Sequence, residues 1–375
     1  MSGPLAGLRV LEVGHILAGP FATMLLADLG ADVIKVESKT GDLSREVGSQ
    51  YVDGHNVYFA SINRNKRSVH IDLVTEEGQA QLHRLVGESD ALLVNMRPSA
   101  IRKLGLDYAS LRGVNPKLVC VSVTGYGLDG PEAEWPAFDY VIQAGVGLAA
   151  MTGDPDGPPM LPGYSAVDNS SAIMAALGLL AKVHEASRSG VGGQVDVSLF
   201  DTILSQLNYK AAAYLNGGAV PPRQPAGGHS FYVPAQLFPT ADGYLALFVT
   251  HDEFWRRLCD EIGEPGWGTD PRFATMHARN DNRAELIALL AAKLAEMSAV
   301  EWAARLRPLG LAVGAVVSLD HALDSDYVAR RGMVVTIPTD DGPLRMVGNP
   351  IRTGEAADFS PPPRLHEHTQ DLLGE

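Results

Sequence analysis

Cysteine is scarce in this sequence, and its scarcity excludes one class of protein. Only Cys120 and Cys259 occur among the 375 residues, so a scaffold held together by disulfides is excluded. Both lie in apolar stretches, LVC and WRRLC, and we expect reduced, buried thiols. No apolar run approaches the ~20 residues of a membrane span. The amino terminus, MSGPLAGLRVLEV, lacks the basic stretch and apolar run of a secretory signal, which predicts a cytoplasmic protein.

Positive charge is also in deficit, with 30 lysines and arginines against 44 aspartates and glutamates and a net charge of -14. This charge opposes binding to nucleic acids and to anionic membranes, so we expect neither as a partner. An anionic ligand can still bind where local basic residues override the overall field. The composition is otherwise that of a globular chain, and its length fits two domains or one large domain with an insert.

Motifs for metals and for several common catalysts are absent. The 11 histidines are scattered, and neither H-E-x-x-H nor C-x-x-C occurs, so no metal site is expected. No G-x-S-x-G elbow and no G-x-x-x-x-G-K-[ST] phosphate loop is present either. His366 and His368 lie in a polar tail, where we interpret them as part of a solvated helix cap.

The first two hundred residues alternate short apolar runs with helical apolar spacing. Strands are expected at 8–13, 32–37, 91–94 and 118–123, and helices at 20–29 and 76–86. Thr75 is a plausible cap for the second of these helices, which has acids in its first turn. This alternation predicts a mostly parallel sheet with helices on both faces.

The later part of the chain predicts a smaller α+β unit. A long apolar helix is expected at 170–186, then a strand at 194–199 and a helix at 200–215, before a Gly- and Pro-rich stretch at 216–228. Beyond it we expect strands at 244–249, 311–318 and 333–337, helices at 253–262, 284–297 and 302–306, and a short helix near Thr369. Ser298 and Glu301 form a capping-box pattern, and Asp341-Gly342 is a turn signal.

The first predicted strand is followed by residues 14–20, GHILAGP. A dinucleotide-binding fold would place G-x-G-x-x-G here, with an acid near the end of the second strand. Glu37 fits the acid, but only Gly14 and Gly19 are present and Pro20 opens the helix. The pattern gives little support to a nicotinamide cofactor, although a helix amino terminus near Gly19 favours a phosphate.

Basic residues cluster at 63–68 (NRNKRS) and at Arg97, Arg102 and Lys103, each time beside a predicted strand. A charge cluster is usually a solvated face of a protein. In an acidic protein, basic residues beside strand ends are also where a phosphorylated ligand would bind. The residues alone leave both interpretations open.

Asp168 lies just before the long apolar helix. One interpretation is that Asp168 or Asn169 caps that helix. The other is that Asp168 is a carboxylate nucleophile at a helix amino terminus, where the helix dipole keeps it ionised. Asp139 and Glu132 carry the same ambiguity. The residues alone therefore indicate an α/β enzyme that binds a phosphorylated anionic ligand.

Several segments, in order along nearly the whole chain, carry a family resemblance. They are residues 4–37, 63–73 (NRNKRSVHIDL), 95–98 (NMRP), 103–108, 115–127, 138–148, 190–201, 238–247 and 270–283. Together they resemble the family III CoA-transferases, the group that contains formyl-CoA transferase, carnitine CoA-transferase and related racemases.

This resemblance implies a fold and an assembly. A Rossmann-like large domain would be built from both chain ends, at residues 1–215 and 325–375, with a small α+β domain at 225–320. Residues 216–224 and 321–324 would link the two domains. The resemblance also implies an interlocked homodimer in which each chain threads through the ring of the other, a rare topology.

The resemblance further implies that Asp168 is the nucleophile. Coenzyme A or acyl-CoA would be a substrate, with no permanently bound cofactor and no metal. The family's CoA contacts would map onto Leu17, Ala18, Lys39, residues 71–74 (among them Ile71 and Asp72), Asn95, Met96, Arg97 and Lys103. Ser38 and Lys39 stand where formyl-CoA transferase has a pair of arginines.

The chemistry of CoA transfer agrees with a carboxylate nucleophile. Attack by Asp168 on the donor thioester would give a mixed anhydride and then an aspartyl-CoA thioester, and each keeps the activation of the thioester without ATP or a metal. Backbone N–H groups must stabilise the oxyanions while water is excluded, and Gly227, Gly228 and His229 are the candidate loop. The longer glycine run of formyl-CoA transferase is missing there, which disfavours oxalate or formate as substrates.

Three other functions stay open. Racemases of the same superfamily have Gly-His-Asp where this chain has Ala137-Phe138-Asp139, so the second base for α-proton exchange is missing. A non-catalytic acyl-CoA-binding protein would not need the carboxylate of Asp168, and a nicotinamide oxidoreductase lacks its fingerprint. Specificity for the acid is expected from the small domain and residues 215–235, where Arg223 or His229 would meet the second carboxylate of a diacid.

Overall fold

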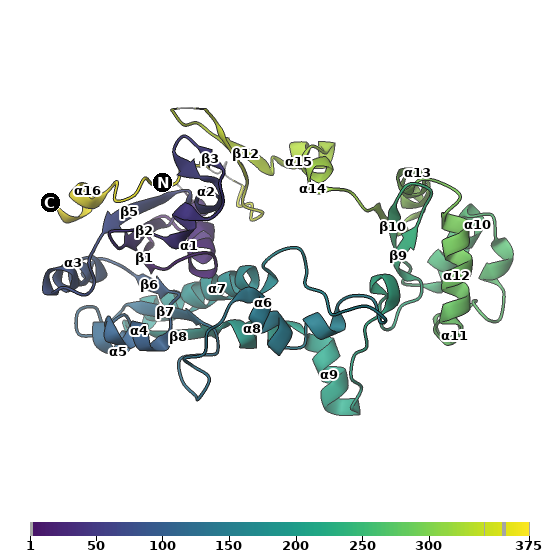
Figure 1. Ribbon diagram of the computed structural model, residues 1–375, viewed down its shortest axis with the longest axis horizontal. Coiled ribbons are helices and arrows are strands. Elements are labelled where there is room, and N and C mark those ends of the chain that lie inside the picture. The colour runs from purple at the N-terminus through teal and green to yellow at the C-terminus, as the bar shows by residue number, and fades with distance from the viewer. Residues whose placement is uncertain (1–2, 341, 355–357, 375) are drawn as a thin grey trace. The chain divides into compact units, whose positions relative to one another are not determined.

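The computed structural model describes residues 3–340, 342–354 and 358–374, and the chain forms two compact units. The first unit comprises Met1–Val146, Gly163–Asn208 and Asp326–Glu375, and the second comprises Gly147–Pro162 and Tyr209–Ser325. Both ends of the chain therefore belong to the first unit (Figure 1). Residues 147–162, which the sequence analysis assigned to the large domain, group with the second unit instead.

A six-stranded parallel sheet forms the centre of the first unit, in the order β5-β2-β1-β6-β7-β8. Its strands are β1 (Arg9–Val13), β2 (Asp32–Glu37), β5 (Lys66–His70), β6 (Ala91–Val94), β7 (Val119–Thr124) and β8 (Gly193–Ser198). From β1 the chain continues to β2 on one side, and it returns to β6 on the other side. The carboxyl ends of β1 and β6 thus border the kind of crevice in which open α/β sheets bind ligands.

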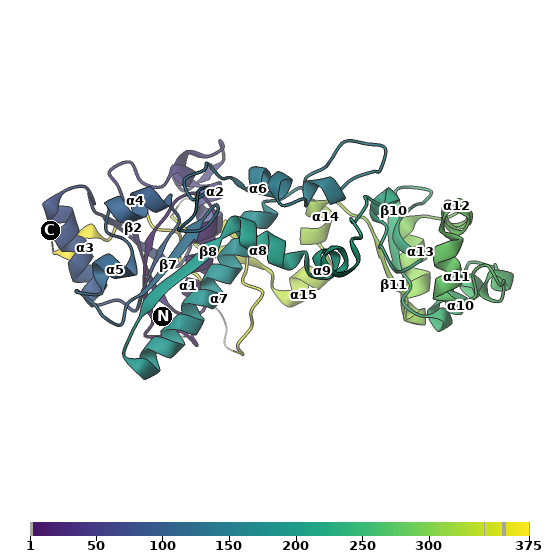
Figure 2. The same cartoon turned by 90° about the horizontal axis from the view of Figure 1, so that it is seen from below.

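Helices cover both faces of this sheet, and β1, β6 and β7 are almost wholly buried as a result. On one face α1 (Ala18–Asp28) packs against α7 (Ala166–Ser189), and α7 packs against β7 and β8 (Figure 2). On the other face, Leu82, Ile101 and Leu111 pack in one core with sheet residues such as Leu11. They belong to α3 (Glu76–Gly87), α4 (Pro98–Lys103) and α5 (Tyr108–Leu111).

Shorter elements complete the first unit. They are β3 (Tyr51–Val52), β4 (His55–Asn56), α2 (Val57–Asn63), α6 (Asp139–Gly145), α8 (Leu199–Gln206), α15 (Asp326–Arg331), the antiparallel pair β12 (Val334–Ile337) and β13 (Leu344–Val347), and α16 (Thr369–Leu373). A single 3-10 turn, η1 (Leu43–Glu46), follows β2 and lies close to the site described below.

The last residues of the chain cover the edge strand β5. The N–H of His368 donates to the carbonyl of Ser68 at 2.9 Å, and the N–H of His70 donates to Oγ1 of Thr369 at 3.0 Å. These bonds occupy an edge that another strand would otherwise be able to join. His368 occupies the N-cap position of α16, as a helix cap there predicts, but its side chain makes no capping bond. Both His366 and His368 are half-buried against β5 rather than solvated.

The second unit is a small α+β body with its own core. Its sheet is antiparallel, in the order β11-β10-β9, and its largest buried side chains include Trp255, Phe273 and Trp302. The elements are η3 (Pro225–Gly227), β9 (Ala235–Pro239), β10 (Tyr244–Phe248), α10 (Asp252–Glu261), α11 (Met276–Asp281), α12 (Arg283–Leu294), α13 (Ala299–Leu306), β11 (Ala312–Ala315) and α14 (Leu319–Leu323), with α9 (Asn208–Gly217) at its start. The predicted capping box of Ser298 and Glu301 begins α13.

The structure confirms the mixed α/β fold with a central parallel sheet, and it corrects several boundaries. Helix α7 begins at Ala166, four residues before the predicted start, and the helix expected at 200–215 is two helices that break at Asn208, where φ is 25°. The expected linker at 321–324 overlaps the helix α14. Asp341, in the predicted turn, lies outside the described residues. Both cysteines are free and buried, as expected.

The basic cluster at 63–68 is not a solvated face. Arg64 and Lys66 are 1% and 3% exposed, and they form ion pairs with Asp28 at 2.6 Å and Glu12 at 2.7 Å. The cluster joins the end of α2 to strand β5, so its side chains point into the interior. There they contact Glu12 of β1 and Asp28 of α1. Buried charges require such partners.

One helix in the described part of the chain, α7, is long and apolar enough to cross a membrane by length and composition alone. Its buried residues, such as Ala172, Ala175 and Leu179, face the sheet and α1. A core helix passes the same test, so α7 is weak support for a membrane protein.

Candidate active site

A cavity of about 230 Å³ lies at the carboxyl ends of β1, β6 and β7, within the first unit. We refer to it as the switch-point cavity. Its lining residues are His15, Ile16, Leu17, Ala18, Asn95, Met96, Arg97, Pro98, Val123, Thr124, Gly125, Ala133, Trp135, Pro136, Ala137, Phe138, Asp168 and Leu199. The position follows from the reversal of strand order between β1 and β6, which leaves the loops after these strands free to diverge.

Asp168 is the third residue of α7 and is half-buried in the wall of this cavity. Asp168 is not the helix cap that one interpretation of the sequence made it, because its carboxylate makes no capping bond and Ser165 occupies the N-cap position. Burial, and then the charge of Asp139, raise the pKa of Asp168 to about 7. The helix dipole that is expected to keep this group ionised is therefore opposed by desolvation and by repulsion from Asp139.

Asp139 supplies the cap that α7 lacks from its own sequence. Its Oδ2 accepts hydrogen bonds from the N–H groups of Val167 at 2.8 Å and Asp168 at 3.0 Å. Its other oxygen accepts from the side chain of Gln143, one turn further along α6. Asp139 is 6% exposed, so these bonds fix the nucleophile candidate against a buried carboxylate. Of the two interpretations that the sequence left open for Asp139, the structure supports the helix cap, although nothing in the local pattern shows that the capped helix is α7.

Tyr58 on α2 is a neighbour of Asp168 that no sequence pattern singles out. Burial raises the pKa of its phenol, and the negative charges of Asp168 and Asp42 raise it further. Tyr58 therefore stays protonated at neutral pH and lies close enough to Asp168 for the two charges to interact.

The turn between β1 and α1, residues 14–18, forms one wall of the cavity. Asn95, just after β6, accepts from the N–H of His15 at 3.0 Å and donates to its carbonyl at 2.8 Å. A Cβ on Gly14 or Gly19 would lie 2.2 or 2.5 Å from Oδ1 of Asn95, so only glycine leaves room for this side chain. These two glycines thus serve the approach of Asn95 rather than a dinucleotide fingerprint.

Ile16 lies at the tip of this turn with φ at 67°. A β-branched residue in this left-handed region is a clear outlier and carries strain of about 1–3 kcal/mol. Its N–H donates to Oδ1 of Asp42 at 3.1 Å. Burial lowers the pKa of the adjacent His15, which is therefore a neutral imidazole in the cavity wall at pH 7.

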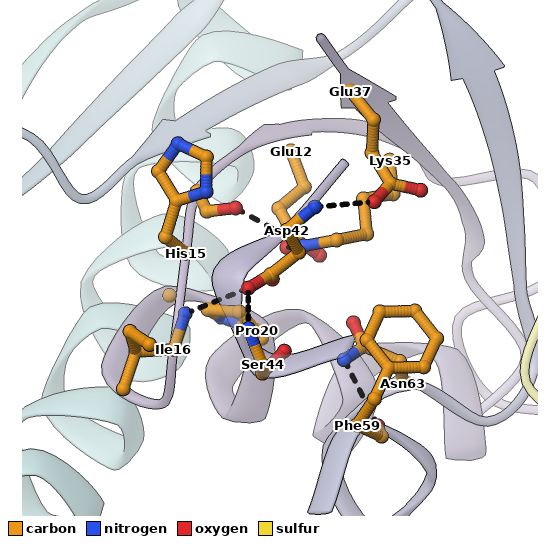
Figure 3. Close-up of polar contacts among 12 residues, drawn as sticks. Glu12, His15, Ile16, Pro20, Lys35, Glu37, Asp42, Ser44, Phe59 and Asn63 are labelled. Atoms are coloured by element: carbon orange, nitrogen blue, oxygen red, sulfur yellow. Dashed lines mark hydrogen bonds and ion pairs between the residues drawn. The ribbon is translucent and has the colours of Figure 1, made fainter. Parts of the chain in front are cut away.

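Beneath the turn lies a buried network of charged side chains, shown in Figure 3. Lys35 pairs with Glu12 at 2.5 Å and with Asp42 at 2.7 Å, and Lys66 pairs with Glu12 at 2.7 Å. Burial alone would raise the pKa of Asp42, but Lys35 outweighs it and holds that pKa at about 2. Asp42 is thus ionised across the physiological range, as an acceptor for the turn must be.

Glu37, the acid that a dinucleotide site would use for a ribose, is committed elsewhere. It accepts from Arg45 at 2.6 Å, from the hydroxyl of Ser68 at 2.6 Å and from the N–H of Asp42 at 2.8 Å. With its oxygens occupied by the protein, Glu37 has little capacity to bind a nicotinamide cofactor.

The residues expected to contact CoA divide into two groups. Leu17, Ala18, Asn95, Met96 and Arg97 line the switch-point cavity together with Asp168. The other four residues do not line this cavity. Lys39, Asp72 and Lys103 are exposed, whereas Ile71 is 1% exposed and packs in the apolar core. Ile71 therefore offers a ligand only its main chain.

The candidate oxyanion loop borders a cavity of about 490 Å³ within the second unit. Gly227, Gly228 and His229 line it together with Lys210 and the sheet residues around Phe248. Nδ1 of His229 accepts from the N–H groups of Phe231 at 3.1 Å and Tyr232 at 3.3 Å, so the neutral ring carries its proton on Nε2. Burial, and then the nearby Lys210 and Arg283, lower the pKa of His229.

Arg223 does not border this second cavity. Its guanidinium donates to the carbonyl oxygens of Asp154 at 2.9 Å and of Gly157, which ties two segments of the second unit together. Within the described ranges no group of three or more His, Cys, Asp and Glu residues has the arrangement of a metal site.

The sequence profile of CoA-transferase family III matches residues 5–369. The chain belongs to this family. It is 35% identical to a succinate--glutarate CoA-transferase of Agrobacterium fabrum over 99% of this chain and 95% of the relative. It is 36% identical to a succinyl-CoA--D-citramalate CoA-transferase of Chloroflexus aurantiacus, over 99% and 94%. These relatives identify the protein as a CoA-transferase family III enzyme.

Solved structures of family III proteins match the whole chain. The crystal structure of a CaiB/BaiF family protein from Brucella suis superposes with a TM-score of 0.87 at 34% identity, covering 100% of this chain and 99% of that one. A protein of Mycobacterium tuberculosis superposes with a TM-score of 0.88 at 32% identity, covering 99% of both chains. The mixed α/β fold is therefore the fold of the family.

Proposed function

We propose that this family III enzyme transfers CoA from an acyl-CoA donor to a short dicarboxylic acid, with Asp168 as the nucleophile. The single observation that supports the role of Asp168 is its place in the switch-point cavity, beside five of the residues expected to bind CoA. Several relatives are named for succinate, glutarate, citramalate or oxalate, which supports a dicarboxylate as acceptor.

The proposed reaction conserves the energy of the thioester. An oxygen of Asp168 attacks the donor carbonyl, which breaks the C–S bond, forms a mixed anhydride and releases CoA thiolate. The thiolate attacks the aspartyl carbonyl, which releases the donor acid and leaves an aspartyl-CoA thioester. The acceptor carboxylate then reverses both steps, so no proton is consumed over the cycle.

A labelled acceptor tests this sequence of steps. In the reaction of the acceptor, one of its carboxylate oxygens becomes part of the anhydride and stays on Asp168 when the thiolate leaves with the new acyl group. Incubation with succinyl-CoA and ¹⁸O-labelled glutarate should therefore place ¹⁸O in the peptide that contains Asp168, as read by mass spectrometry. Transfer of CoA without label in that peptide would contradict the covalent route.

Trapping with hydroxylamine distinguishes the alternatives. An aspartyl adduct that forms with an acyl-CoA donor and is lost in Asp168→Ala supports the transferase. Exchange of deuterium into the α carbon of a 2-methylacyl-CoA, without an adduct, would instead indicate a racemase. Binding of acyl-CoA without either reaction would indicate a non-catalytic binding protein.

We further propose that the protein is a homodimer, as the family resemblance implies. In the single chain, Ile173, Met174 and Leu177 of α7 are 54%, 40% and 59% exposed, an apolar stripe that self-association would cover. Sedimentation analysis should give the mass of two chains for the protein and that of one chain for Ile173→Asp.

We also propose a cytoplasmic location, which cell fractionation tests.

A further inference from the structure

The turn at residues 14–18 is held from two directions by groups that are not part of it. Asn95 binds both main-chain polar groups of His15, and Asp42 accepts the N–H of Ile16. Ile16 needs such a restraint, because a β-branched residue leaves the left-handed region unless its surroundings fix it there.

Asp42 is itself held in place through both carboxylate oxygens and its main-chain N–H. Its Oδ1 also accepts from the N–H of Ser44 at 2.8 Å, and its own N–H donates to Glu37 at 2.8 Å. Its Oδ2 pairs with Lys35 at 2.7 Å. Asp42 and Lys35 are 1% and 0% exposed, so neither side chain can turn toward water without opening the core.

The two buried lysines, Lys35 and Lys66, bind main-chain carbonyl groups at the two ends of the turn. Nζ of Lys35 donates to the carbonyl of Gly14 at 3.1 Å, where the turn begins. Nζ of Lys66 donates to the carbonyl of Pro20 at 2.7 Å, just after the turn. Both lysines form ion pairs with Glu12, so a single buried carboxylate aligns the groups that anchor the two ends.

We propose that Asp42 is a positioning residue, which acts through the conformation of Ile16 to fix this wall of the switch-point cavity before any ligand arrives. The inference rests on the proposed use of that cavity for CoA. A preformed wall spares the ligand the entropy of ordering the turn, so Asp42 should contribute to affinity for CoA without contact with it. Ile16, Leu17 and Ala18 line the cavity, whereas Asp42 does not.

A double-mutant cycle on CoA affinity tests this mechanism. Asp42→Ala should weaken CoA binding, measured by calorimetry, about tenfold. Ile16→Gly removes the penalty for positive φ, so the same Asp42→Ala change in that background should weaken binding only about two- to threefold. Equal losses in both backgrounds would show that Asp42 does not act through Ile16.

Asp28→Ala is the matched control for lost stability. Asp28 is also a buried carboxylate, 9% exposed, and it is paired with Arg64 at 2.6 Å, but neither residue lines the cavity. The Asp28→Ala substitution should lower the melting temperature and leave the affinity for CoA unchanged. If Asp28→Ala lost as much affinity for CoA as Asp42→Ala, general destabilisation would explain the effect of Asp42→Ala, and the proposal would fail.

Hydrogen–deuterium exchange on the unaltered protein tests the same point without any variant. The amides of His15 and Ile16 should be protected in the absence of CoA, because Asn95 and Asp42 hold them. Exchange as fast as that of an exposed loop would overturn the proposal even if Asp42→Ala fails to fold. Protection of these amides in a protein that does not bind CoA would instead overturn the use of the cavity for CoA and leave the restraint itself supported.

Discussion

Asp168 is the residue whose environment departs furthest from that of an ordinary carboxylate in the candidate site. Its raised pKa has a reactive consequence, since a carboxylate of higher basicity is a stronger nucleophile once ionised. It also means that the ionised fraction changes across the neutral range. The neighbouring Asp139 both caps α7 and repels the charge of Asp168, so it controls orientation and ionisation together.

We predict that transfer activity follows the ionisation of Asp168. With a pKa of about 7, kcat/KM should rise roughly tenfold per pH unit below that value and level off above it. Asp139→Asn removes a negative charge but keeps an oxygen for the N–H groups of Val167 and Asp168, so the midpoint should move to lower pH. Glu76→Gln, which removes an exposed acid on α3, is the control and should leave the midpoint in place.

Asp168 should also reduce the stability of the protein at neutral pH. A carboxyl group whose pKa rises from 3.8 to about 7 on folding keeps its proton longer in the native state, so unfolding becomes easier as pH rises through this window. Asp168→Asn should therefore raise the free energy of unfolding at pH 8, on the order of 1 kcal/mol, and change it little at pH 4. Chemical denaturation at the two pH values measures the difference, and equal effects at both would argue against a raised pKa.

At the scale of elements, the amino end of α1 depends on the close approach of Asn95. A Cβ at Gly19 would lie 2.5 Å from its Oδ1, so Gly19→Ala should displace Asn95 and release the main chain of His15. We expect a loss of CoA affinity of about tenfold and a destabilisation of about 1–3 kcal/mol. Gly87→Ala is the matched control, because a Cβ at this last residue of α3 meets nothing within 4 Å, so the free energy of unfolding should change by less than about 0.5 kcal/mol.

Sequence patterns were sufficient for the elements whose stabilisation is local. The buried runs of β1, β6 and β7, the Thr75 cap of α3 and the capping box at Ser298 were all predictable, because period, propensity and caps act within a few residues. The start of α7 was missed because its cap, Asp139, comes from another helix 28 residues earlier in the chain. The burial of the cluster at 63–68 was missed for the same reason, since its partners Asp28 and Glu12 are distant in sequence.

The part of the candidate site that was predictable consists of residues that both the strand pattern and the family resemblance point to. Leu17, Ala18 and residues 95–97 share one cavity because they follow β1 and β6 at the switch point, and Asp168 joins them at the amino end of α7. No pattern within the sequence marks Asp42 or Tyr58, because their significance depends on the tertiary positions of charges. Arg223 was a reasonable candidate for a free cation, but backbone carbonyl groups of the second unit use its donors.

At the scale of the whole molecule, the first unit is completed by residues from the far end of the chain. Removal of residues 364–375 would expose the edge of β5 and delete Leu373, which is 6% exposed in the core behind α3. We predict a loss of a few kcal/mol of stability, of which burial of the leucine accounts for about 1.5–3 kcal/mol. Thermal unfolding of this truncation should show a lower melting temperature, whereas removal of the last two residues alone should leave it nearly unchanged.

The covered edge of β5 has a consequence for how this enzyme is made in the cell. Translation produces β5 early, while Thr369, which binds this strand, follows His70 by 299 residues. Throughout that interval a nascent chain has a parallel sheet with an open edge, a species prone to pair with its neighbours. Chaperones that hold nascent chains should therefore matter more for the yield of this protein than its finished stability would indicate.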